Sequence, residues 1–407
     1  MSGPLTGIRV VDMTTMLSGP WAAMILADQG ADVIKVEQPQ TGDHVRSLGN
    51  QRAGMSAMFL NINRHKRSIT VDMKSPRGRD IVRDLAKGAD VFLQNFRPGV
   101  VDRLGVGEAD IRAVAPNIVY ASVSGFGDVG PWVGKPVYDP IIQAISGLTT
   151  VQAGSDNERP RLIRTVLPDK LAAVTIAQSI SAALVSKMRT GKGQHLRVSM
   201  LDSVMYFLWA SDMGAQTYPD KTMSNQEAAS FIDLIYETQD GFMTVAVMSN
   251  KEWIGLTKAL DKPQWLADER FSSPGARDKH VNERLIMTQE VLKEQSTAHW
   301  MQRLEAFDVP CSPALKRSEV INHPQVLSAG CIVEVDHHAA GRLRQARSPA
   351  QFDKTPSAIR FGAPLLGEHN EEILKELGYS SALIRELHDS KIVGSESISR
   401  NSERLES

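Results

Sequence analysis

Cysteine is scarce in this sequence, with only Cys311 and Cys331 among its 407 residues. Two cysteines cannot build a disulfide framework, and so low a number is typical of a reduced, cytosolic protein. The His-Glu-x-x-His and Cys-x-x-Cys spacings that bind zinc do not occur either. We therefore expect a cytosolic protein without a metal site.

The chain also lacks an excess of either charge, since 46 Lys and Arg stand against 47 Asp and Glu. Without a basic surplus to neutralise phosphates, we expect no nucleic acid partner. Long apolar runs are missing too, and none approaches the ~20 residues that a membrane helix needs. The N-terminal stretch MSGPLTGIRVVDM has no basic region followed by a long apolar run. We expect neither a signal peptide nor a membrane partner.

Short apolar runs alternate with helical patterns through the first half of the chain. The runs IRVVDM, ADVIKVE, SITVDM and NIVYASVSGFG are typical of buried strands, and PWAAMILADQG and SPRGRDIVRDLAK of the helices between them. A strand, a helix and a second strand in this order form a right-handed parallel unit. The pattern predicts an α/β fold with an open, doubly wound sheet.

The pattern changes near residues 210–225. The stretch LIYETQDGFMTVAVM predicts a hairpin turning at Asp240 and Gly241, and amphipathic helices follow it. We predict a large domain that begins with residues 1–205, a small α+β domain over 225–325, a C-terminal segment 326–393 that returns to the large domain, and a disordered tail over 394–407, where serine and charge dominate.

The first strand-to-helix turn, TTMLSGP, lacks the G-x-G-x-x-G spacing that lets a pyrophosphate approach the backbone. A dehydrogenase using a nicotinamide or flavin dinucleotide is therefore disfavoured. Loops at the carboxyl ends of the strands should still hold a ligand, because that edge is where open α/β sheets bind one.

Several stretches together resemble the class III CoA-transferase family, the formyl-CoA transferase-like or CaiB-BaiF type. The resemblance covers nearly the whole chain in collinear order and rests on PLTGIRVVDMT, SGPWAAMILADQGADVIKVEQPQTGD, NINRHKRSITVDMKSPRG, DVFLQNFRPGVVDRLG, VYASVSGFGDVGP, YDPIIQAISGL, RTGKGQHLRVSMLDSV and APLLGEHNEEILKELG. It implies a Rossmann-like large domain, an inserted small domain and a homodimer whose two chains interlock.

The resemblance also implies a nucleophile, an Asp that opens the helix after the YDPIIQAISG segment, which here is Asp169. By its position alone Asp169 is predicted to be the N-cap of that helix. The two roles are compatible, because the positive end of a helix stabilises a carboxylate and keeps it ionised. In the family this carboxylate accepts CoA from an acyl-CoA donor as a thioester and passes it to a free acid, without a metal or bound cofactor.

The resemblance further implies which residues contact CoA. Cations in conformable loops suit its phosphates, although a lone Lys or Arg is more often a solvated surface charge. Arg97 and Arg103 are favoured, since they flank a Pro-Gly turn after a predicted strand. For Met200 an adenine contact and a core position stay open. The implied contacts are Leu17, Ser18, Val71, Asp72, Met73, Lys74, Asn95, Phe96, Arg97, Arg103, Lys135, Val137, Tyr138 and Met200.

Two departures from the formyl-CoA and oxalate enzymes bear on the substrate. Those enzymes carry a Gln where this chain has Leu17, and a run of glycines where it has AVMSNKEWIG. A Gln side chain can hydrogen-bond a small carboxylate and a Leu side chain cannot. Formate and oxalate are therefore disfavoured, and a larger dicarboxylic or branched acid is favoured.

Two alternatives remain. The α-methylacyl-CoA racemases share the fold and move an α-proton with a His and an Asp, but Tyr138 stands where that His would be. A phenol, with an ordinary pKa of ~10, is a poor base at pH 7. A CoA-binding protein without turnover is the other alternative, and Asp169 argues against it. Asp139 and Glu37 are further acidic candidates, for which capping at a strand end is the simpler explanation.

Overall fold

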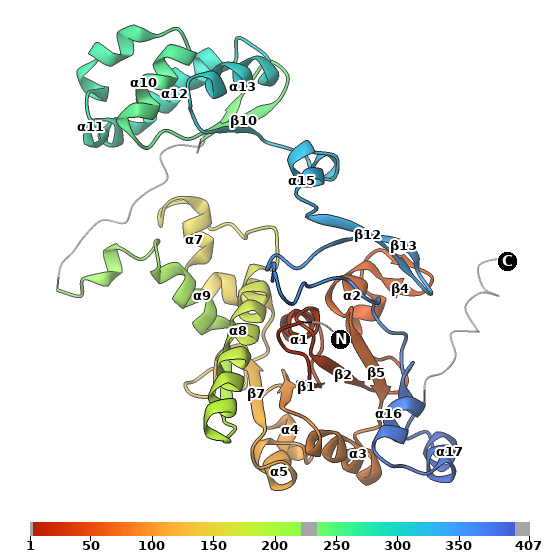
Figure 1. Ribbon diagram of the computed structural model, residues 1–407. Helices are drawn as coiled ribbons and strands as arrows, with labels where there is room; N and C mark the ends of the chain where they lie inside the picture. Colours follow the sequence, from red (N-terminus) through yellow and green to blue (C-terminus); the bar gives the residue numbers. More distant parts are fainter. Residues whose placement is uncertain (1–2, 221–233, 395–407) are drawn as a thin grey trace, which may run out of the picture. The chain divides into compact units, whose positions relative to one another are not determined.

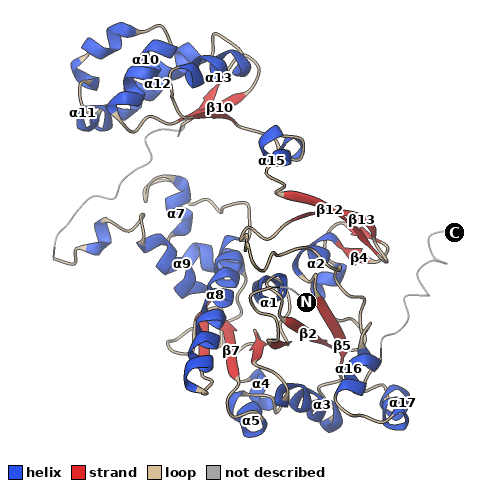
Figure 2. Cartoon of the chain, in the orientation of Figure 1, coloured by secondary structure: helices blue, strands red, loops and turns tan. Residues whose placement is uncertain are grey.

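The computed structural model describes residues 3–220 and 234–394 (Figures 1 and 2). Contacts divide the chain into two compact units. Unit 1 comprises residues 1–149, 162–213 and 330–407, and unit 2 comprises residues 150–161 and 214–329. The segment 225–325, predicted as the small domain, falls within unit 2. The tail predicted from residue 394 onward lies outside the described residues, apart from Gly394 itself.

Six strands form a parallel sheet in unit 1, which confirms the predicted α/β class with a parallel sheet. The sheet order is β5-β2-β1-β6-β7-β8. The chain order thus reverses between β1 and β6, as in a dinucleotide-binding sheet, and ligands bind outside the carboxyl ends at such a point. The strands are β1 (Arg9–Asp12), β2 (Asp32–Glu37), β5 (Lys66–Thr70), β6 (Val91–Gln94), β7 (Val119–Ser124) and β8 (His195–Ser199).

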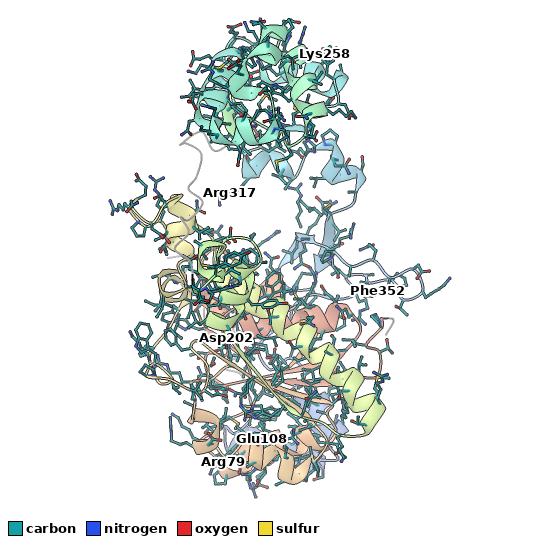
Figure 3. All side chains as sticks on the ribbon, turned by 90° about the vertical axis from the view of Figure 1, so that its left-hand side faces the viewer. Arg79, Glu108, Asp202, Lys258, Arg317 and Phe352 are labelled. Carbon is teal, nitrogen blue, oxygen red and sulfur yellow. The ribbon has the colours of Figure 1, made fainter. Side chains whose placement is uncertain are left out.

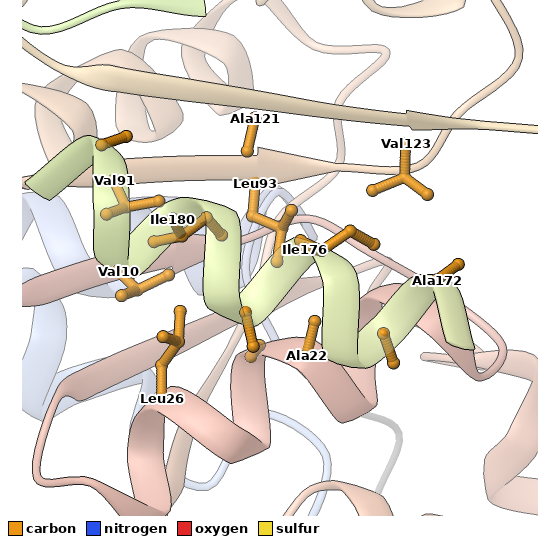
Figure 4. Packing of buried hydrophobic residues seen from close by; sticks show 14 of the residues in the cluster. Val10, Ala22, Leu26, Val91, Leu93, Ala121, Val123, Ala172, Ile176 and Ile180 are labelled. Carbon is orange, nitrogen blue, oxygen red and sulfur yellow. The ribbon is translucent and has the colours of Figure 1, made fainter. Parts of the chain in front are cut away.

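Helices cover both faces of this sheet because successive side chains of each strand point to opposite sides. Val10 belongs to the core cluster that includes α1 (Ser18–Asp28) and α8 (Leu167–Thr190), whose apolar side chains converge on the strands in Figure 4. Val11 belongs to the opposite cluster, built with α3 (Pro76–Lys87), α5 (Glu108–Val114), α16 (Asn370–Glu376) and α17 (Ser381–Asp389). Figure 3 marks α3 and α5 by Arg79 and Glu108.

Helix α8 corrects the expectation that no segment could cross a membrane. By length and composition its 24 residues could do so, and among the described residues it is the one such helix. The helix packs along the sheet, and its buried residues are Pro168, Ala172, Ala173, Ile176, Ala177, Ile180, Ala183 and Leu184. Burial of one face in the core accounts for part of its apolar composition. The uncharged Thr, Ser and Gln residues between its apolar ones hid this length in the sequence.

Shorter elements connect the strands of unit 1. The hairpin of β12 (Ile332–His337) and β13 (Gly341–Ala346) pairs only within itself and does not extend the parallel sheet. The other elements of unit 1 are the 3-10 turn η1 (His44–Ser47), the strands β3 (Gln51–Arg52) and β4 (Met55–Ser56), and the helices α2 (Ala57–Ile62), α4 (Val100–Arg103), α6 (Asp139–Ile145) and α9 (Met200–Trp209). Helix α7 (Leu148–Ala153) begins in unit 1 and ends in unit 2.

Unit 2 is built on a three-stranded antiparallel sheet of order β11-β10-β9. Phe242 pairs with Glu237, which confirms the predicted hairpin at Asp240 and Gly241. Its strands are β9 (Ile235–Glu237), β10 (Phe242–Val245) and β11 (Cys311–Pro313), its helices α10 (Asn250–Ala259), α11 (Pro274–Lys279), α12 (Val281–Leu292), α13 (Thr297–Ala306), α14 (Arg317–Val320) and α15 (Pro324–Ser328), and its 3-10 turns η2 (Ala215–Thr217), η3 (Pro263–Ala267) and η4 (Glu269–Phe271).

Candidate active site

The loop between β1 and α1 is tied to the loop after β6 across the point where the strand order reverses. The backbone N–H of Thr15 donates to Asn95 Oδ1 at 2.9 Å, and Asn95 Nδ2 donates back to the carbonyl of Thr15 at 2.8 Å. Asn95 is one of the residues predicted to contact CoA. This reciprocal pair places the N-terminus of α1 at the edge where open α/β sheets bind ligands.

Asp169 lies in the first turn of α8 but does not cap it. The helix begins at Leu167, and its N-cap is Val166, which makes no side-chain capping bond. The predicted N-cap is therefore wrong by three positions. Pro168 explains the difference, because the fixed φ of proline suits the first helical turn and extends the helix toward its N-terminus.

The carboxylate of Asp169 faces the start of a second helix. Both the hydroxyl and the backbone N–H of Ser18, the first residue of α1, act on it and lower its pKa. The first N–H groups of a helix have no partner within the helix and carry its positive partial charge. The nucleophile predicted from the sequence thus lies at a ready-made anion site formed by α1.

A second carboxylate supports the turn that carries Asp169. Asp139 is buried at the start of α6, and its Oδ2 accepts the backbone N–H of Asp169 at 3.3 Å. Its Oδ1 accepts Gln143 Nε2 at 2.6 Å. Asp139 therefore caps the first turn of α8 and not a strand end, which corrects the sequence interpretation. The i, i+4 spacing of Asp139 and Gln143 is a sequence signal for their contact. No such local signal connects Asp139 with Asp169, which lies 30 residues further along the chain.

Gln143 in turn fixes the segment that leads into α8. Its Oε1 accepts the backbone N–H of Ile163 at 2.9 Å. Close to the same segment, Lys170 Nζ donates to Thr165 Oγ1 at 2.7 Å. The approach to Asp169 is thus held by side chains from α6 and from α8 itself.

Burial and charge raise the pKa of Asp169 to about 6. Desolvation is the largest cause and the negative charge of Asp139 the second, while the two bonds from Ser18 act in the opposite direction. Burial raises the pKa of Asp139 as well. The sequence had suggested that a helix terminus alone would set the ionisation. The helix donors are present, but burial and the neighbouring carboxylate outweigh them.

The other predicted CoA contacts all follow the carboxyl ends of parallel strands. Leu17 and Ser18 are buried after β1, whereas Lys74, Arg97 and Arg103 are exposed after β5 and β6. Lys135 lies over the ring of Trp132, and Met200 is buried in the core cluster of α8. The remaining residues follow the same strands: Val71, Asp72 and Met73 after β5, Asn95 and Phe96 after β6, and Val137 and Tyr138 after β7.

Glu37 serves the sheet and lies apart from the Asp169 cluster. Arg46 binds its carboxylate through Nε at 2.8 Å and Nη2 at 2.7 Å. Ser68 and the backbone of Asp43 donate to it as well. Burial would raise the pKa of Glu37, but the charge and hydrogen bonds of Arg46, together with Lys35 and the backbone N–H of Asp43, lower it to about 2.

A separate cavity of about 320 Å³ opens along β6, β7 and β8. Gln94 donates to Ser122 Oγ at 3.0 Å, and Ser122 Oγ lies 2.8 Å from His195 Nε2. Phe96 alone is shared with the predicted CoA contacts, and Asp169 is not among the lining residues. In the part of the chain that is described, no group of three or more His, Cys, Asp or Glu residues could hold a metal ion.

Comparison with known proteins decides the family. The sequence profile of CoA-transferase family III matches residues 5–370 of this chain. The chain belongs to CoA-transferase family III. It is 32% identical over 396 residues to the succinyl-CoA:glutarate CoA-transferase of Homo sapiens, covering 96% of this chain and 90% of that one. It is 30% identical over 416 residues to the formyl-CoA:oxalate CoA-transferase of Bradyrhizobium sp. (strain ORS 278), covering 96% of this chain and 97% of that one.

Solved structures place this CoA-transferase in the same fold. A CAIB/BAIF family protein from Brucella suis superposes with a TM-score of 0.81 at 30% identity, over 93% of this chain and all of that one. Rv3272 from Mycobacterium tuberculosis superposes with a TM-score of 0.79 at 28% identity, over 91% of this chain and 98% of that one. The family resemblance and the CoA-transferase class inferred from the sequence are thereby confirmed.

Proposed function

We propose that this enzyme transfers CoA from an acyl-CoA donor to a free carboxylic acid through a thioester on Asp169. One observation carries the proposal: both the hydroxyl and the backbone N–H of Ser18 act on the Asp169 carboxylate and lower its pKa. The carboxylate therefore faces the start of α1, beside the point where the strand order reverses. A carboxylate oriented by donors at a ligand-binding edge can serve as a nucleophile.

The chemistry proceeds in balanced steps. An Oδ of Asp169 attacks the thioester carbonyl, the C–S bond breaks, and CoA thiolate leaves behind a mixed anhydride. The thiolate then attacks the carbonyl carbon of Asp169, the anhydride C–O bond breaks, and the donor acid leaves as its carboxylate. The acceptor carboxylate attacks the resulting aspartyl-CoA thioester, and the same steps run in reverse. Every proton and electron pair is accounted for without a metal or a bound cofactor.

The raised pKa of Asp169 lowers the cost of the first step. A carboxylate of ordinary pKa ~4 that displaces a thiolate of pKa ~8.5 faces a gap worth roughly 6 kcal/mol if fully expressed. A nucleophile of pKa about 6 narrows that gap to about 2.5 pKa units, or about 3 kcal/mol. At pH 7 such a group is still mostly ionised. Burial therefore makes the carboxylate more basic without removing its charge at the working pH.

CoA is proposed to bind along the carboxyl edge of the sheet. Exposed Lys74, Arg97 and Arg103 follow β5 and β6, and exposed cations are available to the phosphates of CoA. Leu17 and Ser18 follow β1, which lies between β5 and β6 in the sheet, and Ser18 faces Asp169. We expect the pantetheine arm to run from the cations toward α1, so that the thioester reaches Asp169.

The acceptor is proposed to be a dicarboxylic acid larger than oxalate, or a branched acid. Leu17 supports this, because an apolar side chain precedes Ser18 at the N-cap of α1 and offers no hydrogen bond to a small carboxylate. Two of the relatives, from Homo sapiens and Agrobacterium fabrum, are named for succinate and glutarate. The relatives named for formate and oxalate are about equally similar, so the choice rests on Leu17.

Two chains are proposed to assemble as the interlocked homodimer that the family resemblance implies. In support, α8 and α9 of unit 1 carry several large apolar side chains that a single chain leaves exposed, and exposed apolar surface can mark an interaction site. These side chains are Val174, Val185, Met188, Tyr206, Phe207 and Trp209.

Intact-protein mass spectrometry after incubation with a mixture of acyl-CoAs tests the function. We expect a covalent CoA adduct on the wild type that free dicarboxylic acid discharges, and none on Asp169→Ala. Asp202→Ala, an exposed carboxylate on α9, is the matched control and should form the adduct. No adduct with any donor, together with exchange of an α-proton for deuterium in a branched acyl-CoA, would overturn the proposal in favour of a racemase.

A further inference from the structure

Two lysines at the edge of the active site are fully buried. Lys35 of β2 and Lys66 of β5 are both 0% exposed. A buried ammonium group is costly unless its charge is paired and its donors are satisfied. Both lysines meet this condition through groups that belong to, or hold, the loop between β1 and α1.

Lys66 binds the first turn of α1 directly. Its Nζ donates to Asp12 Oδ2 at 2.8 Å, to Asn63 Oδ1 at 2.7 Å and to the carbonyl of Pro20 at 2.7 Å. All three ammonium donors are therefore used. Pro20 is two residues beyond Ser18, in the same helical turn. Burial lowers the pKa of Lys66 only to about 8, so the side chain is charged at pH 7.

The other groups of this network hold the loop residues before Ser18. Asp12 Oδ1 accepts the backbone N–H of Thr14 at 2.9 Å, and Lys35 Nζ donates to the carbonyl of the same residue at 2.8 Å. Lys35 also pairs with Asp43 Oδ2 at 2.8 Å. Asp43 Oδ1 in turn accepts the backbone N–H of Met16 at 3.0 Å.

The loop is held in a conformation that it would not favour by itself. Met16 has φ of 69°, in the left-handed region that residues other than glycine rarely adopt. A Cβ on Gly19 would lie 2.3 Å from Thr14 Cβ, so the loop and the start of α1 are in close contact. Strain of this kind persists only where the surroundings determine the backbone, and it occurs at functional sites.

We propose that Lys66, with its partner Asp12, is a positioning residue that sets the Ser18 donors against the Asp169 carboxylate. The inference rests on the proposed function of Asp169. Apolar residues of similar volume often stabilise a protein as well as a buried ion pair does. We therefore assign the pair a role in positioning and not in stability. Its directional hydrogen bonds fix the backbone of Thr14 and Pro20, on either side of Ser18. A small misplacement of a group that holds the nucleophile is costly in rate.

The variants Lys66→Met and Lys66→Met/Asp12→Asn test the positioning role. The double variant removes both charges and leaves an amide that can bond to Asn63 Oδ1 or to the Pro20 carbonyl. We expect it to restore the unfolding midpoint that the single variant loses. The rate of CoA adduct formation should stay at least tenfold below wild type in both. If Lys66→Met alone does not fold, the double variant provides the same comparison.

The ionisation of Asp169 supplies a readout that a purely structural role would not change. If the Ser18 donors are displaced, they no longer lower the pKa of Asp169. The acid limb, which is the fall of the adduct-formation rate as the pH decreases, should then have its midpoint above pH 6. Combining the double variant with Ser18→Ala should add no further shift. Lys187→Met, which removes a partly buried ion pair with Asp90 at the far end of α8, is the control and should leave the limb in place.

Two outcomes separate the hypotheses. A wild type that forms no adduct contradicts the proposed function itself. A wild type that forms the adduct, beside a folded double variant with the same rate and the same acid limb, overturns only the positioning role of Lys66.

Discussion

The backbone N–H of Asp169 lies 3.3 Å from Asp139 Oδ2, so one carboxylate caps the helical turn that carries the other. The contact stabilises the turn through a hydrogen bond and, through the charge of Asp139, disfavours ionisation of Asp169. Structural support and basicity of the nucleophile are thus coupled in a single interaction. The pH dependence of the enzyme should report this coupling.

The wild-type rate of adduct formation should fall as the pH drops through about 6, because only the ionised Asp169 attacks a thioester. We expect a tenfold loss for each pH unit well below that value. Stopped-flow measurement of thiolate release under single-turnover conditions, repeated across pH, gives the midpoint of this acid limb. A limb near pH 4, the ordinary carboxyl value, would contradict the raised pKa of Asp169.

Asp139→Asn should move the acid limb to lower pH. Removing the negative charge removes the second largest cause of the raised pKa of Asp169. The asparagine amide also faces Gln143 Nε2, which leaves two donors opposed, so we expect a loss of about 1–3 kcal/mol in the free energy of unfolding. Single-turnover profiles and denaturant titration measure the two effects. An unchanged limb in a folded variant would refute the electrostatic role of Asp139.

Ser18→Ala should shift the limb in the opposite direction. The variant loses the hydroxyl donor to Asp169 and keeps the backbone N–H, so the pKa of the carboxyl rises above about 6. At pH 7 the rate should fall several-fold and recover toward pH 8. Ser179→Ala, at a half-buried position of α8, is the matched control. A rate lowered equally at every pH would instead indicate a steric defect.

Asp169→Asn should abolish the adduct and raise the unfolding midpoint at pH 7. The folded state holds the proton up to pH about 6, above the ordinary value of 3.8, so stability from this group falls as pH rises between those values. The asparagine side chain does not ionise, so above pH 6 the variant avoids this loss of folding stability. Thermal unfolding at pH 4 and pH 7 tests this, since the gain should be present at pH 7 and nearly absent at pH 4. A variant destabilised at pH 7 would contradict the prediction.

The sheet was predictable because its signals are local. Apolar runs bounded by glycines, such as the run that ends at Gly30, define the strands and their crossover helices. Asp240 and Gly241 define the hairpin turn. The position of Asp169 at the start of a long helix came from the order of the family's motifs.

The environment of Asp169 was not predictable, because it arises from residues far apart in the chain. Asp139 and Ser18 reach Asp169 only after α6, α1 and α8 pack together. Lysines in short strands are also typical of exposed positions, and nothing local shows that Lys35 and Lys66 are buried. The start of α8 moved for a local reason, the proline at position 168.

The long helix behind Asp169 gives the reaction a fixed point. One face of α8, from Pro168 to Leu184, packs into the core, so the backbone of Asp169 cannot shift without disturbing the centre of unit 1. Asp169 can turn only about its own side-chain bonds. In the transfer that we propose, the acyl group, the thiolate and the incoming acid must each reach this one carboxylate in succession, so the order in which they gain access to it sets the order of the steps.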